Sequence, residues 1–296
     1  MKRGLILLIL SFVLLWFTGC IYKQQTSDPT TETSPETTDE LQITKDQFVT
    51  INDTVYHRSN KKIYDEFNGE YYYYSEKATA IEWPTELAGC SDISALHDSL
   101  ICKTFATKFR DASIDKTVKN FVSTAKFLEY ADEDISAIRI EKPTTEQDMN
   151  YYYESIRIRP SMTSPSLITF SMMHSDYTGG AHGYYFMNHI NFDKKSGMVF
   201  DSNNSFKQSQ IPEVIRIINQ YIDAKNETYE HTDLIPDFYL TSLGFTFVFN
   251  PYAIACYAEG IVEIDIPYSA LAPYLSEDIK APLKDKDEFS IITYDK

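Results

Sequence analysis

Three histidines lie in one short stretch of the chain, at His174, His182 and His189. Three imidazoles can bind zinc, so the geometry of this stretch decides whether they do. A turn with three glycines, Gly179, Gly180 and Gly183, separates two segments in which polar and apolar residues alternate, and this pattern predicts a β-hairpin. If the hairpin pairs about Gly180, His174 and His189 point to opposite faces. We therefore expect no metal or other cofactor, and we expect His182 to hydrogen-bond the backbone of the turn.

Other residue types that could do chemistry do not form a recognised catalytic pattern. Ser175 and Asp176 follow His174, but neighbours on a strand alternate faces, so adjacency makes no catalytic triad. The sequence has no Gly-x-Ser-x-Gly elbow, phosphate loop or His-Glu-x-x-His motif. Glu263 and Asp265 share a face of the last predicted strand, about 7 Å apart by strand rise. The main expectation is a protein without catalysis, and an envelope hydrolase that uses such a carboxylate pair on cell-wall glycans is the alternative.

The elements that position these residues predict an α+β fold. We expect two small domains, at 41–165 and 166–275, each a mainly antiparallel sheet covered by one or two helices, followed by a tail at 276–296. In the second domain, an apolar stripe predicts a helix over 212–223. Alternating residues predict strands around Phe247 and Ile264.

In the first domain, a strand pair is expected over residues 70–82, and Pro84 is expected to stop it. A helix should begin at Ser91 or Asp92, because both can cap it, and its apolar face extends to Phe109. A second helix is predicted over 115–130, with Leu128 facing inward.

The charge of the chain excludes one class of partner. The formal net charge is −16, and the first 19 residues carry only Lys2 and Arg3, so the chain from Cys20 onward carries −18. Nucleic-acid binding depends on Lys and Arg at phosphates, so we expect no nucleic-acid partner. A strongly acidic surface favours a cationic partner instead.

The start of the chain has the pattern of an export signal. A short positive segment precedes an apolar run, and Phe17-Thr18-Gly19-Cys20 resembles a bacterial lipobox, although Phe17 stands where leucine is usual. This pattern predicts a lipoprotein signal peptide at 1–19, acylation of Cys20, and an extracytoplasmic protein held in a membrane by lipid. Residues 20–40 are rich in Thr, Ser, Pro and Glu, which predicts a disordered tether. Which membrane holds the anchor is left open.

Three cysteines remain after Cys20, namely Cys90, Cys102 and Cys256. An odd number in an oxidising compartment leaves at least one thiol unpaired. Cys90 and Cys102 would lie about 15 Å apart along the predicted helix, beyond disulfide reach. We expect no bond between them.

Several motifs of the second region resemble a bacterial exported domain of unknown function, domain 3298. The motifs are Tyr177-Thr178-Gly179-Gly180-Ala181-His182-Gly183, Asn191-Phe192-Asp193, Phe247-Val248-Phe249-Asn250-Pro251-Tyr252, Ala258-Glu259-Gly260 and Ile266-Pro267-Tyr268-Ser269. The region 48–165 more loosely resembles its usual N-terminal companion, domain 4163. The resemblance implies the extracytoplasmic part of an anti-sigma factor that senses lysozyme, or a non-catalytic module beside a peptidoglycan deacetylase. The chain shows neither an internal transmembrane helix nor a deacetylase domain, so signalling and deacetylation are not expected of it.

Together, these features predict a lipid-anchored binding or sensing protein of the cell envelope. The resemblance and the acidic charge indicate a cationic protein such as lysozyme, or peptidoglycan, as the ligand. Tyrosines expose a hydroxyl while burying a ring, which suits a binding surface. The predicted binding residues are Tyr177, His182, Tyr184, Tyr252 and Tyr257.

Overall fold

The computed structural model describes residues 45–66, 69–132, 134–143 and 151–292. These residues fall within one compact unit, Leu41–Lys296. They form mainly antiparallel sheets and a few helices, which confirms the predicted α+β class. A two-stranded ribbon of β2 (Ile63–Asp65) and β3 (Gly69–Tyr71) stands apart from the two larger sheets.

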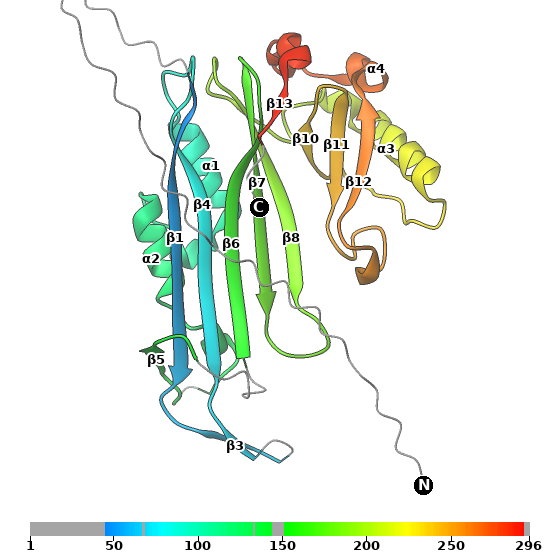
Figure 1. The fold of residues 1–296 in the computed structure, drawn as a ribbon. Coiled ribbons are helices and arrows are strands. Elements are labelled where there is room, and N and C mark those ends of the chain that lie inside the picture. Colours follow the sequence, from blue (N-terminus) through cyan, green and yellow to red (C-terminus); the bar gives the residue numbers. More distant parts are fainter. Residues whose placement is uncertain (1–44, 67–68, 133, 144–150, 293–296) are drawn as a thin grey trace, which may run out of the picture. The chain divides into compact units, whose positions relative to one another are not determined.

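The large sheet has the strand order β5-β1-β4-β6-β7-β8-β9, and β13 pairs with the end of β6 (Figure 1). Its strands are β1 (Gln47–Ser59), β4 (Tyr74–Glu86), β5 (Ala137–Ile140), β6 (Tyr151–Thr163), β7 (Leu167–Tyr177), β8 (Tyr184–Asp193), β9 (Val199–Phe200) and β13 (Ser290–Ile291). Among the strands that the structure describes, only the β4–β6 pair is parallel. Parallel neighbours need a long crossover connection, and the segment with α1 and α2 supplies it.

Two helices cover one face of the large sheet, α1 (Ser94–Thr104) and α2 (Ile114–Val122) (Figure 1). Their buried residues include Leu96, Leu100, Val118 and Phe121, which pack on apolar side chains of β4, β6, β7 and β8. The first helix is shorter than predicted. It ends before Phe105, whose backbone is extended, and a separate 3₁₀ turn at Thr107–Phe109 then buries Phe109.

The second helix is also shorter than the sequence pattern predicted. It ends at Val122, and a 3₁₀ turn, η2 (Lys126–Glu129), follows it. The change of geometry turns Leu128 outward, where it is 38% exposed, so the prediction that Leu128 faces inward was wrong. Phe127 is buried instead.

Pro84 does not end its strand. β4 continues to Glu86, and Phe48 of β1 lies opposite Pro84. Hydrogen-bonded pairing between β4 and β6 extends only from Tyr74 to Ile81. At Pro84, β4 therefore has no partner strand on the β6 side, and the absence of an N–H in proline removes no ladder hydrogen bond on that side. Proline is therefore tolerated where one edge of β4 has become free.

A second, three-stranded sheet contains β10 (Asp237–Leu240), β11 (Gly244–Phe249) and β12 (Val262–Pro267). The helix α3 (Ile211–Lys225) packs against it through Val214, Ile218 and Ile222, which confirms the predicted helix and its apolar stripe. The short helices α4 (Tyr268–Leu271) and α5 (Glu277–Lys280) add Leu271 and Ile279 to the same core, and α4 follows β12 directly (Figure 1). Phe206, Phe238, Phe245 and Phe247 form its aromatic centre.

The large sheet continues across the domain boundary that the sequence indicated at residue 165. That position is the turn between β6 and β7, which are neighbouring strands. The small sheet joins the large one through Asn191 of β8, whose amide donates to the Phe238 carbonyl at 2.9 Å. The stretch expected to be a tail contributes α5 and β13, and its Ile279 is fully buried.

Candidate functional site

The β7–β8 hairpin has the register that the sequence predicted. His174 lies opposite Phe186 and Ser171 lies opposite His189, so the pairing is centred on Gly180. Side chains alternate along a strand, so His174 and His189 point to opposite faces and cannot share an ion. Among the residues that the structure describes, no group of three or more His, Cys, Asp and Glu side chains could hold a metal ion.

The backbone approaches itself closely at Gly183, where the turn rejoins β8. A Cβ at this position would lie 2.7 Å from the carbonyl oxygen of Asp176 and 3.0 Å from the hydroxyl of Tyr153. The Gly183 carbonyl accepts hydrogen bonds from His182 Nδ1 at 2.9 Å and from the Tyr257 hydroxyl at 2.6 Å. His182 therefore bonds the turn backbone, as predicted.

The ring of His182 stacks on Tyr257, with centroids 3.8 Å apart and planes at 18°. The Tyr252 hydroxyl lies 3.3 Å from His182 Nε2. In a neutral imidazole whose Nδ1–H donates to Gly183, Nε2 accepts, so Tyr252 is the donor. Tyr185 meets Tyr257 edge-on at 5.9 Å. We call His182, Tyr185, Tyr252 and Tyr257 the tip cluster.

The loop that carries Tyr252 is fastened to the hairpin. The Asn250 side chain accepts from the Met187 backbone N–H at 2.6 Å and donates to the Met187 carbonyl at 3.0 Å. Tyr252 has φ 70°, the only positive φ of a described residue other than glycine, and it is 60% exposed. Such a backbone conformation is costly for tyrosine and is kept only where its surroundings fix it. The tip cluster thus presents an exposed ring on a fixed support.

The tip cluster contains three of the five residues predicted to bind a ligand, namely His182, Tyr252 and Tyr257. Tyr177 lies beside the turn, where it stacks on Tyr153 with centroids 6.1 Å apart. Tyr184 is 45% exposed and packs near Phe186, on the face opposite to the tip cluster. Tyr185 was not among the predicted binding residues. Because it follows Tyr184 directly on the strand, it points to the opposite face of the sheet, where the tip cluster lies.

Opposite the tip cluster, a second group of polar side chains lies under the helices. The Glu154 carboxylate accepts from His174 Nε2 at 2.8 Å and pairs with Lys77 at 2.8 Å. Lys126 lies 3.3 Å from Asp176 and 3.9 Å from Glu154. The sheet register places Lys77, Glu154 and Asp176 in one row. We call Lys77, Lys126, Glu154, His174 and Asp176 the charge cluster.

In the charge cluster, burial and ion pairing shift the pKa values of Lys77 and Glu154 in opposite directions. Lys77 is fully buried, and its ammonium lies 4.5 Å and 4.4 Å from the ring centroids of Phe109 and Phe121. Burial lowers the pKa of Lys77, while the charge of Glu154 opposes the change. Burial alone would raise the pKa of Glu154, but the bond from His174 and the charge of Lys77 lower it to about 2. The Glu154 carboxylate therefore stays charged at neutral pH.

A cavity of about 420 Å³ opens beside the charge cluster, and Phe105, Cys102 and Lys108 form part of its wall. Nδ1 of His174 is buried and has no hydrogen-bond partner among the described residues. An imidazole oriented by a carboxylate can act as a base. Here, however, a lysine neutralises each carboxylate, which is the arrangement of a structural ion network. Lys77 is four residues before Ile81 on β4, and Glu154 is four residues before Ile158 on β6, so both charged side chains point to the same buried face as these isoleucines. A charged residue at a position where the strand pattern predicts an inward-facing side chain was the sequence signal that could have revealed the cluster.

The third histidine of the stretch also has a fixed partner. His189 Nδ1 lies 2.8 Å from the Asp237 carboxylate, and the His189 side chain is almost completely buried. The two carboxylates considered for hydrolysis share a face, as predicted, and each accepts a hydrogen bond from another strand of the small sheet, Glu263 from β10 across the sheet and Asp265 from the adjacent β11. Glu263 accepts from the Tyr239 hydroxyl at 3.2 Å, and Asp265 accepts from the Thr246 hydroxyl at 2.5 Å. Burial, followed by the Glu263 charge, raises the pKa of Tyr239 to about 12.

Cys90, Cys102 and Cys256 are all free thiols. Cys20, the predicted lipidation site, lies outside the described residues. Within the part of the chain that the structure describes, no helix is both long enough and apolar enough to cross a membrane.

A comparison with protein-family models matches one segment in the C-terminal part of the chain. Residues 202–269 match the family model described as "Protein of unknown function (DUF3298)". No curated protein matches the chain.

Two crystal structures of DUF3298 family proteins resemble this fold. One, from Bacteroides fragilis NCTC 9343, is 18% identical with a TM-score of 0.58, and the alignment covers 82% of this chain and 96% of that one. The other, from Pseudomonas aeruginosa PAO1, is 15% identical with a TM-score of 0.50, and the alignment covers 80% and 96%. At these identities the likeness shows the fold alone.

Proposed function

We propose that this chain is a lipid-anchored binding or sensing protein of the bacterial cell envelope, without catalysis, and that the tip cluster contacts its ligand. The proposed ligand is a cationic protein such as lysozyme, or peptidoglycan. The tip cluster carries the proposal, because it presents aromatic rings with polar ends on a support that two distant segments hold in place.

The support matters because binding orders side chains at a cost. An immobilised side chain loses about 0.5–1.5 kcal/mol of conformational free energy on association. His182 and Tyr257 are already stacked and both bond the Gly183 carbonyl. These side chains therefore lose most of their conformational freedom when the chain folds and little more when a ligand binds. Tyrosine side chains are also typical of binding hot spots.

The charge of the chain supports a cationic ligand over an anionic one. From Cys20 onward the net charge is −18, since the −16 of the full chain includes Lys2 and Arg3. Such a charge accelerates encounters with cationic partners and slows them with anionic ones, and salt screens both effects.

His174 and His189, whose imidazoles are the side chains best suited to act as catalytic bases, are held by fixed partners. This arrangement supports a binding function over catalysis. Glu154 and Lys77 hold His174 in a charged network, and Asp237 holds His189. Each of the two histidines bonds a carboxylate rather than a serine or cysteine, so these contacts assemble no pair of nucleophile and base.

Binding of lysozyme to the full-length chain in detergent tests the proposed function. We expect binding at low salt that weakens steeply with ionic strength, and no binding of an acidic protein of similar size. Pelleting with purified peptidoglycan tests the second ligand. Absence of binding to both, or turnover of peptidoglycan by the same preparation, would contradict the proposal.

A Cys20→Ala variant tests the membrane anchor separately. We expect this variant in the soluble fraction, because acyl chains contribute about 0.8 kcal/mol for each CH₂ group that they bury in the bilayer. Unchanged membrane association would contradict the anchor and would leave the ligand-binding tests unaffected.

A further inference from the structure

The outer edge of β1 is open over most of its length. β5 pairs with β1 only from Tyr56 to Ser59. Between Gln47 and Val55, no described strand pairs with the edge of β1 that faces away from β4. Along such an edge every second residue directs its N–H and C=O outward, which makes it a template for another extended chain.

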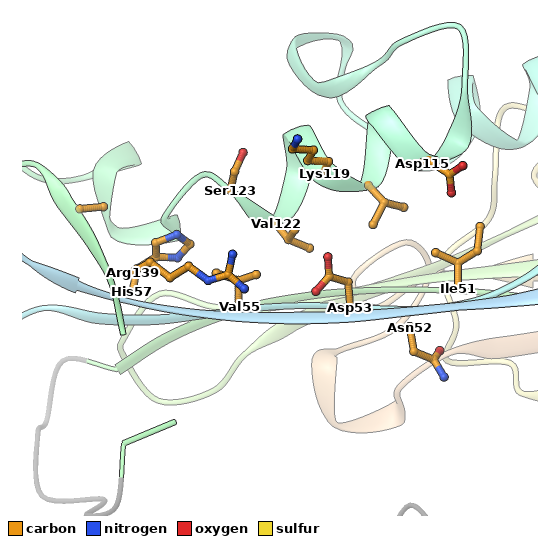
Figure 2. A pocket seen from close by; sticks show the side chains of 12 residues that line it. Ile51, Asn52, Asp53, Val55, His57, Asp115, Lys119, Val122, Ser123 and Arg139 are labelled. Carbon is orange, nitrogen blue, oxygen red and sulfur yellow. The ribbon is translucent and has the colours of Figure 1, made fainter. Parts of the chain in front are cut away.

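A groove of about 570 Å³ lies along this open edge, between β1 and α2 (Figure 2). Figure 2 shows Ile51, Asp53 and Val55 on the side of the strand that faces α2, whereas Asn52 points to the opposite face. The floor of the groove is apolar and consists of Val55, Val118 and Val122, all buried. The groove therefore accommodates the side chains of alternate residues of an added strand.

One half of the groove, near Ile51, carries two acidic side chains, and two basic ones, Lys119 and Arg139, line the groove as well (Figure 2). Asp53 from β1 and Asp115 from the first turn of α2 both line it, and neither carboxylate has an ion-pair partner among the described residues. Ile51 and Val55 flank Asp53 on the same face of β1. This order of apolar, acidic and apolar positions complements a strand with apolar, basic and apolar side chains.

The other half of the groove contains an unsatisfied buried group. His57 is only 4% exposed, and its Nδ1 has no hydrogen-bond partner among the described residues. Burial lowers the pKa of His57, and the charges of Lys77 and Arg139 lower it further, while a hydrogen bond to the Ser123 backbone acts in the opposite direction. A neutral His57 thus offers an acceptor nitrogen to a donor that enters the groove.

We propose that this groove binds an extended peptide that adds as a strand to β1 and places a basic side chain between two apolar ones. Main-chain hydrogen bonds to the edge would supply affinity, and the alternating pockets would supply specificity. The basic side chain reaches Asp53 and Asp115, the apolar ones cover Ile51 and Val55, and a donor near the β5 end satisfies His57.

A second copy of this chain fits the edge less well. An antiparallel pairing of two β1 edges centred near Asp53 would bring both Asp53 carboxylates together, and like charges directly opposite are destabilising. The net charge of −16 also disfavours self-association. The groove is separate from the tip cluster, because β4, β6 and β7 lie between β1 and β8.

A designed peptide tests the proposal. The probe is fluorescein-labelled Thr-Val-Thr-Lys-Thr-Val-Thr with blocked ends, a palindrome that presents lysine to Asp53 in either strand direction. We expect it to bind the full-length chain at low salt, and we expect a peptide with glutamate in place of lysine to bind at least tenfold more weakly. N-methylation of alternate peptide nitrogens should abolish binding, because it removes the ladder donors.

Matched variants decide whether the groove is the site. The double variant Asp53→Asn/Asp115→Asn should weaken binding of the lysine peptide roughly tenfold, as expected for the loss of two charge pairs. The exposed aspartates Asp233 and Asp278 lie on distant elements, and changing both to Asn alters the net charge equally, so it should leave affinity unchanged. Hydrogen exchange should show new protection of the amides between Gln47 and Val55.

Four results would overturn the proposal, three from the peptide experiments and one from sedimentation. The peptide does not bind, or the two double variants bind it alike, or the protection appears outside β1. Sedimentation that shows dimers of the wild-type chain, lost in Asp53→Asn/Asp115→Asn, would also overturn it, because a second copy would then occupy the edge.

Discussion

His174 and His182 lie on the same hairpin and have opposite surroundings. His182 is exposed at the turn, with aromatic rings and one backbone carbonyl as its neighbours. The side chain of His174 is only 15% exposed, and it contacts Phe186 and bonds Glu154, which in turn pairs with Lys77 and Lys126. The first environment suits contact with a partner, and the second stabilises the interior of the fold.

The two clusters also differ in what a substitution would remove. At the tip cluster, a lost side chain exposes its neighbours to water, which can hydrate them. In the charge cluster, a lost side chain leaves an opposite charge buried without its partner, and that is far more costly. Substitutions should therefore affect binding at the tip cluster and the free energy of unfolding at the charge cluster.

The largest effect should come from Glu154→Gln. The variant leaves the fully buried Lys77 without a counter-charge, which typically costs about 3–5 kcal/mol of unfolding free energy. Urea unfolding at neutral pH measures this loss. Glu263→Gln is the matched control, because Glu263 is a half-buried strand residue whose side chain has, among the described residues, only the Tyr239 hydroxyl as its partner, and this variant should lose less than about 1 kcal/mol of unfolding free energy. Equal losses in both variants would contradict a special role of the Lys77–Glu154 pair in stability.

The pH dependence of stability should report the same pair. The pKa of Glu154 falls from 4.5 to about 2 on folding, so its contribution is complete above pH 4.5 and disappears as the pH falls toward 2. The shift corresponds to roughly 3 kcal/mol, by 1.36 kcal/mol for each pKa unit. The stability difference between wild type and Glu154→Gln should therefore shrink between pH 5 and pH 2. Lys77, Lys126, Glu129 and Asp176 are the other charged groups at this site, and His174 bonds Glu154, so the difference between the two proteins, not the wild-type curve, is the quantity to measure.

A smaller effect is expected for Gly183→Ala, which tests the support of the tip cluster. The new Cβ would lie 2.7 Å from the Asp176 carbonyl oxygen, and such overpacking costs about 2 kcal/mol. Gly179→Ala is the control. Gly179 has φ +95°, and a Cβ added there would meet no atom within 4 Å, so only backbone strain of about 1 kcal/mol is expected. Calorimetry compares the unfolding free energies of the two variants. If Gly179→Ala lost as much stability as Gly183→Ala or more, the close backbone contact would not explain why glycine is needed at position 183.

The smallest effect on stability, and the clearest on binding, should come from Tyr252→Ala. Tyr252 is 60% exposed, so unfolding free energy should change by less than about 1 kcal/mol, while affinity for lysozyme should fall about tenfold or more. Tyr64→Ala is the matched control, because Tyr64 is 72% exposed and lies on β2, away from the tip cluster. Titration calorimetry compares the two variants. If both variants bound lysozyme with equal affinity, the tip cluster would not be the ligand-binding surface.

Local patterns in the sequence predicted the parts of the fold that depend on near neighbours. The hairpin register followed from the glycine turn and the alternation around it, and the structure centres the pairing on Gly180. The apolar stripe of α3 was also predicted, because Pro212 and the isoleucines mark its start and its buried face. His182 was correctly expected to bond the turn.

The rest depended on contacts between distant segments. Tyr252 reaches His182 across 70 residues because Asn250 fastens its loop to Met187, and no local pattern encodes that fastening. The charge cluster forms because β4 and β6 are parallel neighbours, which brings Lys77 opposite Glu154. The early end of α1 similarly reflects the packing of Phe105 and Phe109, which a helical periodicity count cannot detect.

Hydrogen exchange of the full-length chain, with and without lysozyme, tests the central claim most directly. The proposed function predicts that lysozyme protects the backbone amides around His182 and Tyr252 and leaves those beside His174 unchanged. Protection centred on the cavity beside the charge cluster, with none at the tip cluster, would contradict it.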